Sequence, residues 1–182
     1  CPACFIGSHP MAGSEKTGLV VARADLYEGA TVAITPPRGT RNHRAVAQLA
    51  WFWRAVGGRA VVLDPSAHDR LVARTSHLPH LVAALLVRRI GRNRPAHFEA
   101  FCGPGLRDTT RIASGSPEMW HDIVKTNCRA IGAELRELRR ATDDLAKRVA
   151  KGDFEAVYAI LAESRELRRR WKEGEARFSG TL

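Results

Sequence analysis

The feature that most constrains the fold is a strand–helix–strand pattern in residues 30–65. ATVAITPP (30–37) is typical of a strand that ends at two prolines, and RAVVLDP (59–65) is typical of a second strand. Between them, RNHRAVAQLAWFWRAVGG (41–58) carries apolar residues at helical spacing and ends in two glycines, a common end signal for a helix. This βαβ pattern predicts a parallel sheet that is buried on both faces.

Downstream of residue 66 the pattern becomes almost entirely helical. An apolar helix is predicted from about Ser66 to Ile90, followed by a glycine-rich loop or short helical turns in residues 101–116. Ser116, Pro117 and Glu118 provide a helix start, and that helix should reach about residue 150, with room for a break. A last amphipathic helix begins after Gly152–Asp153. Two such helices favour a helical bundle or a dimer interface.

The net charge of +10 raises the question of nucleic-acid binding. Residues 129–182 hold 13 Lys/Arg against 10 Asp/Glu, so the C-terminal helices carry little of the excess. Four arginines cluster in LVRRIGRNRP (86–95), but no aromatic residues are interleaved for stacking on bases. We therefore expect no nucleic-acid partner. A basic nucleic-acid-binding helical protein remains the third hypothesis.

The cysteines and the apolar runs bear on compartment and metal content. No uninterrupted apolar stretch reaches the length of a membrane span, and the N-terminus lacks the pattern of a secretory signal. Cys1 and Cys4 form a CxxC, but no second ligand pair follows nearby, so reduced thiols are favoured over a zinc site. We expect a cytoplasmic protein with no metal and no membrane contact.

His9 is the first candidate for chemistry. It follows the short apolar run CFIG (4–7), separated from it only by Ser8, and we interpret this run as a strand. Ligands of open α/β sheets bind beyond the carboxyl ends of the strands, and His9 is expected at that edge. A lone histidine is more often a hydrogen-bonded core residue, so this alternative stays open.

SHLPH (76–80) places two histidines and a proline at the start of the most apolar helix. His77 and His80 are three residues apart and therefore share one helix face, where they either face an anionic substrate or are structural. Pro79 fits the first turn of a helix or a kink. Farther along, Arg111 is suited to bind a carboxylate through two hydrogen bonds, or else it pins its own loop through Asp108.

Three polar stretches together resemble the prephenate dehydrogenase family, which includes arogenate and cyclohexadienyl dehydrogenases. They are HPMAGSEKTG (9–18), SHLPH within VVLDPSAHDRLVARTSHLPHLVAALLV (61–87), and RDTTRIASGSPEMW (107–120). Such enzymes oxidise and decarboxylate prephenate or arogenate on the way to tyrosine, with NAD or NADP as the oxidant. The resemblance implies an α/β remnant of a Rossmann-type domain in residues 1–66, followed by an all-helical substrate-binding domain in residues 67–182 that forms a homodimer.

The resemblance also implies roles for individual residues. His9 would be the catalytic histidine that accepts the proton of the substrate's ring hydroxyl, and Arg111 would bind a substrate carboxylate. Glu15 and Asp108 would belong to an ionic network around the pocket. The remaining substrate-binding residues would be Ser76, His77, His80 and Trp120.

Two departures from the family pattern limit what the chain is expected to do alone. The dinucleotide fingerprint Gly-x-Gly-x-x-Gly is absent, so the cofactor-binding residues are unknown and the chain is expected to begin late in the Rossmann domain. Pro104 and Leu106 interrupt the glycine run that usually precedes RDTTRIA. The alternative interpretation is therefore a catalytically inactive helical dimerisation module.

Overall fold

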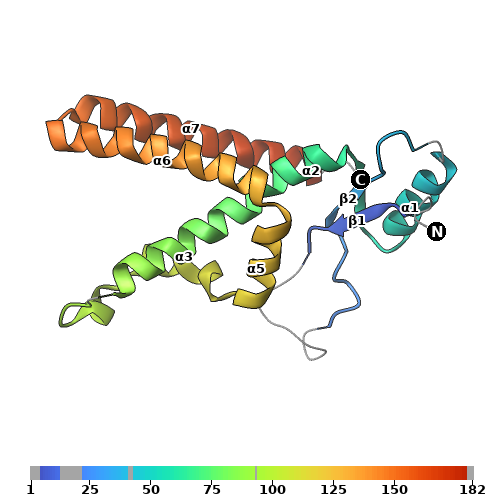
Figure 1. The fold of residues 1–182 in the computed structure, drawn as a ribbon, viewed down its shortest axis with the longest axis horizontal. Coiled ribbons are helices and arrows are strands. Elements are labelled where there is room, and N and C mark those ends of the chain that lie inside the picture. The colour runs from blue at the N-terminus through green and yellow to red at the C-terminus, as the bar shows by residue number, and fades with distance from the viewer. Residues whose placement is uncertain (1–4, 13–21, 41–42, 93, 180–182) are drawn as a thin grey trace. The chain divides into compact units, whose positions relative to one another are not determined.

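The computed structural model describes residues 5–12, 22–40, 43–92 and 94–179 of the 182-residue chain (Figure 1). It divides into unit 1, residues 1–134, and unit 2, residues 135–182. Unit 1 holds the sheet and most of the helices, and the described residues of unit 2 form two helical segments joined by a turn at Gly152 and Asp153. The order predicted from the sequence, α/β first and all-α afterwards, is confirmed.

A three-stranded sheet in the order β1–β2–β3 organises the N-terminal part of unit 1. The central strand β2 (Thr31–Thr35) pairs in parallel with β3 (Arg59–Val62), as the βαβ pattern predicted. The crossover helix α1 (His43–Ala55) packs on both strands. The chain turns away after the helix at Gly57, whose φ of +84° favours a residue without Cβ. Val32 and Ile34 of β2 are completely buried and form the centre of this core.

The edge strand β1 (Gly7–Pro10) corrects two sequence-based expectations. It pairs with β2 in antiparallel fashion, so the sheet is mixed rather than parallel. His9 lies within β1, opposite Ala33, and does not follow a strand that ends at Gly7. The physical reason is the hydrogen-bond ladder, which continues past His9 to the bond from the Met11 N–H to the Thr31 carbonyl. Pro10 is compatible with this position because an edge strand tolerates a missing donor.

The predicted helix from Ser66 to Ile90 is confirmed as a nearly continuous helix in three segments. They are α2 (Pro65–Val72), a π-helical turn η3 (Ala73–His77) and α3 (Leu78–Gly91). Asp64 caps the start by accepting hydrogen bonds from the Ser66 N–H and hydroxyl. Those bonds, with help from Arg38, hold the pKa of Asp64 well below its usual range.

The π-helical turn explains how Pro79 is accommodated in the apolar helix. Proline has no N–H to donate to the carbonyl four residues earlier. The Leu78 N–H instead reaches back five residues to the Ala73 carbonyl, which closes the wide π turn immediately before Pro79. Such turns often mark functional sites. SHLPH therefore begins inside η3 and continues into α3.

Short helices and one long helix complete unit 1. The glycine-rich stretch after α3 forms helical turns, as one of its two interpretations predicted. Pro104 occupies the first position of its helix, where a backbone N–H has no helical partner. The predicted helix from Ser116 is broken at Asn127. These elements are η4 (Phe98–Phe101), α4 (Pro104–Thr110), η5 (Arg111–Ser114), α5 (Pro117–Thr126) and the start of α6 (Cys128–Lys151).

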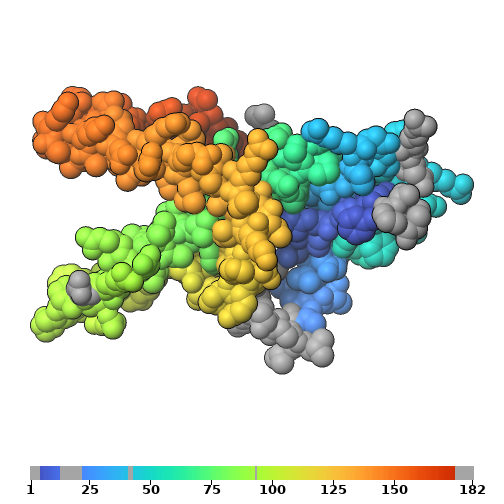
Figure 2. Space-filling model, in the orientation of Figure 1, coloured from blue at the N-terminus to red at the C-terminus, as the bar shows by residue number. Residues whose placement is uncertain are grey.

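Unit 2 is a helical hairpin. Gly152 and Asp153 reverse the chain between α6 and α7 (Phe154–Ser179), and the two helices lie against each other (Figures 1 and 2). Ion pairs along each helix satisfy many of its charges, including Arg148 with Asp144. Among the helices that the structure describes, none is both long and apolar enough to cross a membrane.

Candidate active site

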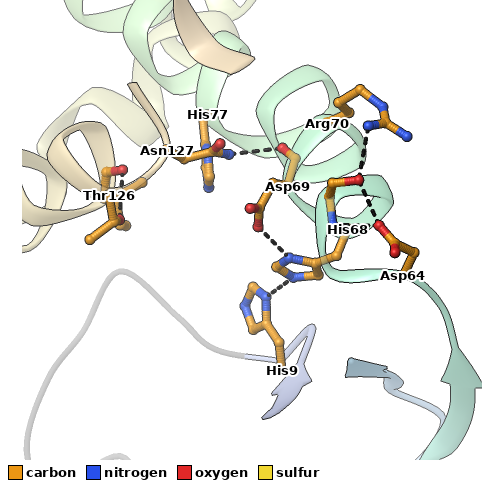
Figure 3. Close-up of polar contacts among 10 residues, drawn as sticks. His9, Asp64, His68, Asp69, Arg70, His77, Thr126 and Asn127 are labelled. Atoms are coloured by element: carbon orange, nitrogen blue, oxygen red, sulfur yellow. Dashed lines mark hydrogen bonds and ion pairs between the residues drawn. The ribbon is translucent and has the colours of Figure 1, made fainter. Parts of the chain in front are cut away.

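Strand β1 and helix α2 bring two histidines together. His9 Nδ1 lies 2.9 Å from His68 Nε2, and the ring planes meet at 67° (Figure 3). The other ring nitrogen of His68, Nδ1, lies 3.0 Å from Oδ1 of the neighbouring Asp69. The side chain of His68 is 17% exposed, whereas that of Asp69 is 55% exposed. A chain of polar contacts therefore runs from the surface carboxylate through His68 to His9.

Asn127, at the junction of α5 and α6, contacts both helix α2 and the π turn η3. Its Nδ2 donates a hydrogen bond to the Asp69 backbone carbonyl at 2.8 Å and lies 3.3 Å from His77 Nδ1 (Figure 3). A second link joins η3 to α6, because the Arg74 guanidinium pairs with the Glu134 carboxylate at 3.0 Å. Both contacts tie the segment that carries His77 to the start of α6.

His77 and His80 pack against Trp120 of α5. The His80 ring stacks on the indole with centroids 3.5 Å apart and planes 11° from parallel. His77 meets the indole edge-on at 6.0 Å. Both histidines are buried, at 8% and 7% exposure. Gly115 is what permits this packing, since a Cβ there would lie 2.8 Å from Trp120 Nε1 and 3.0 Å from His80 Cε1.

The environment of these imidazoles favours their neutral forms. Loss of hydrating water lowers the pKa of His9, and the neighbouring His68 lowers it further. Burial is also the main cause that lowers the pKa of His77, with smaller contributions from His9 and His68. Burial alone lowers the pKa of His80. At neutral pH the site therefore presents uncharged rings that can accept or donate single protons.

Two cavities in unit 1 border these residues. One of about 470 Å³ is mostly apolar, and its lining includes His80, Gly115, Trp120 and Lys125. The other, of about 420 Å³, is lined by Asp69, Asn127 and residues of α2 and α6. Cavities of this size suit a small ring compound. Neither His9 nor Arg111 is among the residues that line these two cavities.

The remaining predicted site residues fall into three groups. Ser76 is half-buried in η3, directly before His77. Arg111 begins η5, which packs on α3, and both it and Asp108 of α4 are exposed. Glu15 lies outside the described residues. The structure thus brings His77, His80 and Trp120 into contact. That His9 and Arg111 act on the same substrate stays a prediction.

Sequence reasoning assigned no role to His68, Asp69 and Asn127. Their contacts join residues more than fifty positions apart, which no local pattern reports. The HD pair in the first turns of the helix after β3 was an available signal, because that end of a strand is where an α/β sheet binds ligands. Asn127 was recognisable as a break between two helices, but its amide contacts were not.

The nicotinamide dinucleotide that the resemblance implies needs backbone N–H groups around its pyrophosphate. The glycine-rich turn that supplies them is absent from the 182 residues. Strand β2 is followed by Pro36 and Pro37, which have no N–H to offer. The residues present do not fit a pyrophosphate site, and none of them is assigned to hold the cofactor.

Comparisons with known proteins identify relatives along most of the chain. It is 35% identical over 166 residues to the prephenate dehydrogenase of Bacillus subtilis, covering 90% of this chain and 44% of that protein. It is 30% identical to the cyclohexadienyl dehydrogenase of Zymomonas mobilis, covering 90% of this chain and 57% of that protein. The chain therefore spans about half the length of the curated relatives it matches.

Solved structures show the same arrangement. Prephenate dehydrogenase from A. aeolicus, in complex with hydroxyphenyl propionate and NAD⁺, matches with a TM-score of 0.84 and 30% identity over 91% of this chain and 58% of that one. Synechocystis arogenate dehydrogenase matches with a TM-score of 0.79 and 27% identity over 92% and 61%. The sheet and helices of this chain are therefore part of a Rossmann domain followed by a helical domain.

Two family models cover consecutive parts of the chain. The model described as prephenate dehydrogenase, nucleotide-binding domain, matches residues 1–62. The model described as prephenate dehydrogenase, dimerization domain, matches residues 64–163, more than half of the chain. Together with the sequence and structural relatives, these matches show that the chain belongs to the prephenate dehydrogenase family.

Proposed function

We propose that this protein takes part in the NAD(P)-dependent oxidative decarboxylation of prephenate or arogenate. The observation that carries the proposal is His9, which lies in the family's HPMAGSEKTG motif and is held by His68 at 2.9 Å in a partly dehydrated position. The oxidant we propose is NAD or NADP, which would accept the hydride when bound. Among the relatives, both prephenate and arogenate dehydrogenases occur, so both substrates are tested.

His9 acts as the general base in this proposal. Its imidazole takes the proton of the substrate's ring hydroxyl as the carbon that bears it is oxidised, and loss of carbon dioxide then makes the ring aromatic. A base must be unprotonated to do this, and the lowered pKa of His9 keeps it so at neutral pH. Turnover should therefore decline on the acid side, below the usual imidazole pKa of about 6.5.

Other residues bind and orient the substrate. Arg111 is proposed to hold a substrate carboxylate through a two-pronged hydrogen bond. Ser76 and His77 of the π turn are proposed to contact the substrate, and His80 with Trp120 to form an apolar wall. We propose Asp108 and Glu15 as members of the surrounding ionic network.

The assembly we propose is a homodimer formed through the helical domain. Support comes from the match of residues 64–163 to a dimerization domain and from the apolar side chains that α7 exposes, including Phe154, Tyr158 and Leu161. The division into domains near residue 66 and the cytoplasmic location stay predictions.

The test of the proposed function is turnover of prephenate and of arogenate with NAD or NADP, followed by the absorbance of the reduced cofactor. It is measured on a longer protein that contains this chain together with the glycine-rich turn absent from the 182 residues. His9→Asn should lower kcat by about 10²–10⁴-fold, the usual contribution of a general base. Arg111→Lys should instead raise KM, because lysine keeps the charge but loses the bidentate geometry. Unchanged kcat in His9→Asn would contradict the assigned role. A folded dimer without turnover would favour the inactive dimerisation module.

A further inference from the structure

The hydrogen bonds from His9 to His68 and from His68 to Asp69 both donate toward the carboxylate, because the acceptor at each step determines which nitrogen of the next ring carries hydrogen. We propose that Asp69 and His68 are positioning residues that keep the proton of neutral His9 on Nδ1 and leave Nε2 bare. The tautomer follows from the geometry when both rings are neutral. Its catalytic consequence rests on the proposed function, in which His9 accepts a proton.

The argument begins at the carboxylate of Asp69, which can only accept hydrogen bonds. His68 Nδ1 lies 3.0 Å from its Oδ1, so Nδ1 is the nitrogen of His68 that carries hydrogen. With His68 in its neutral form, which has one N–H, its Nε2 is an acceptor. His9 Nδ1, 2.9 Å away, must donate to it. The proton of His9 is thus fixed on Nδ1.

The remaining nitrogen of His9, Nε2, is then the only basic atom of the ring. A histidine with its proton on Nε2 would present a donor at that position and could not accept the hydroxyl proton there. The pair of contacts therefore does for His9 what a carboxylate does for the histidine of a Ser-His-Asp triad, with one additional ring between them. When His9 becomes cationic, His68 still accepts its Nδ1–H, so the contact survives the proton transfer.

His77 provides a contrast within the same cluster. The Asp69 backbone carbonyl accepts from Asn127 Nδ2, which fixes the orientation of that amide. The same Nδ2 lies 3.3 Å from His77 Nδ1, which must then be an acceptor. Neutral His77 therefore carries its proton on Nε2. The Asp69 side chain therefore favours the Nδ1–H form of His9 through His68. The Asp69 backbone carbonyl favours the Nε2–H form of His77 through Asn127.

The tautomers are measurable in this chain without cofactor or substrate, by ¹⁵N chemical shifts of the imidazole nitrogens. We expect His9 with hydrogen on Nδ1 and His77 with hydrogen on Nε2. In Asp69→Asn the side chain can either accept from His68 or donate to it, so the bias imposed by the carboxylate is lost and the Nε2–H form of His9 should gain population. His77 should not change, because its link to residue 69 runs through the backbone.

The control and the rescue separate positioning from a structural role. His121 and Asp122 form a similar neighbouring pair at 3.2 Å on the surface of α5, so Asp122→Asn should leave His9 unchanged. In the double variant Asp69→Asn/His68→Glu, the new carboxylate accepts directly from His9 Nδ1 and should restore the Nδ1–H form. It should also raise the pKa of His9, because a negative charge then stands beside the ring. In the wild type the described titratable groups of this cluster are His68, Asp69 and His77.

Kinetics give the second readout. Asp69→Asn should lower kcat about 10- to 100-fold with KM changed less than about threefold, as expected when an orienting partner is lost. The double variant should recover most of this loss, with its acid limb at higher pH. Wild-type His9 protonated on Nε2, an unchanged tautomer in Asp69→Asn, or no recovery in the double variant would overturn the proposal. These rates are measured on a longer protein that also carries the glycine-rich turn, and absent turnover in its wild-type form would count against the proposed function and leave the tautomer assignment standing.

Discussion

In unit 1 two histidines are more than nine-tenths buried, whereas none of the side chains described in unit 2 is buried. Unit 2 instead exposes large apolar residues along both of its helices, and its charges pair with one another, as in the Glu166–Arg169 contact that helps to lower the pKa of Glu166 to about 2. Its exposed large apolar side chains are Leu145, Val149, Phe154, Tyr158, Leu161, Leu167 and Trp171.

The difference indicates which unit determines the geometry of the site and which one determines assembly. Unit 1 orders polar groups inside a protein environment, where a missing partner is costly and each ring is held in one position. Unit 2 leaves an apolar surface that is stabilised only when another surface covers it. The site should therefore respond to substitutions in unit 1, and the assembly to substitutions on the surface of unit 2.

The largest expected effect is on assembly. Leu161→Lys places a charge on the exposed apolar surface of α7, where leucine is 64% exposed. Burying a leucine contributes about 1.5–3 kcal/mol, and a twofold-symmetric interface counts it twice. We expect the dimer dissociation constant to rise roughly 10²–10⁴-fold in analytical ultracentrifugation. Phe52→Lys, at an exposed position of α1 outside the matched dimerization domain, is the control. Equal effects of both variants would contradict the comparison.

An intermediate effect is expected from Gly115→Ala in unit 1. Its φ of −62° suits any residue, so the cost comes from the Cβ that would meet Trp120 and His80. Overpacking of this kind destabilises by about 1–3 kcal/mol in urea unfolding. Gly105→Ala in α4 is the matched control, because nothing lies within 4 Å of its Cβ and alanine favours a helix by about 0.5–1 kcal/mol. A neutral Gly115→Ala would mean that the stacked rings are not tightly packed.

The smallest expected effect is a pH dependence of stability that arises in unit 1. The folded state lowers the pKa of His77 and His80, so the unfolded chain binds more protons below about pH 6.5. The free energy of unfolding should be constant above pH 7.5, fall as the pH drops through 6.5, and level off below the folded pKa values. Each pKa unit of difference contributes about 1.4 kcal/mol. His43→Gln, at an exposed position, should not alter the curve. No decrease between pH 7.5 and 5.5 would contradict the burial of the two histidines.

The sequence predicted the elements better than the contacts between them. Periodicity and helix signals predicted the βαβ unit, the long helix through SHLPH and the start of a last helix after Gly152–Asp153, because these depend on neighbouring residues. The antiparallel pairing of β1 and the π turn before Pro79 depend on backbone hydrogen bonds that no side-chain pattern records.

The same limit applies to the site. The family resemblance assigned His77, His80 and Trp120 to one substrate pocket. The three rings are in contact in the structure, and their roles in substrate binding stay predictions. The contact between His9 and His68 joins positions 59 residues apart and was missed. Neither residue type nor spacing distinguishes such a histidine from one whose ring has no side-chain partner.

The most direct test of the central claim, that His9 and Arg111 act on the same anionic substrate, is an NMR titration of the chain with prephenate. We expect the imidazole nitrogens of His9 and the guanidinium of Arg111 to shift together along one saturable binding curve. His9→Asn should leave the Arg111 response in place. Shifts confined to the arginine cluster at Arg88 and Arg89, or to only one of the two residues, would contradict the claim.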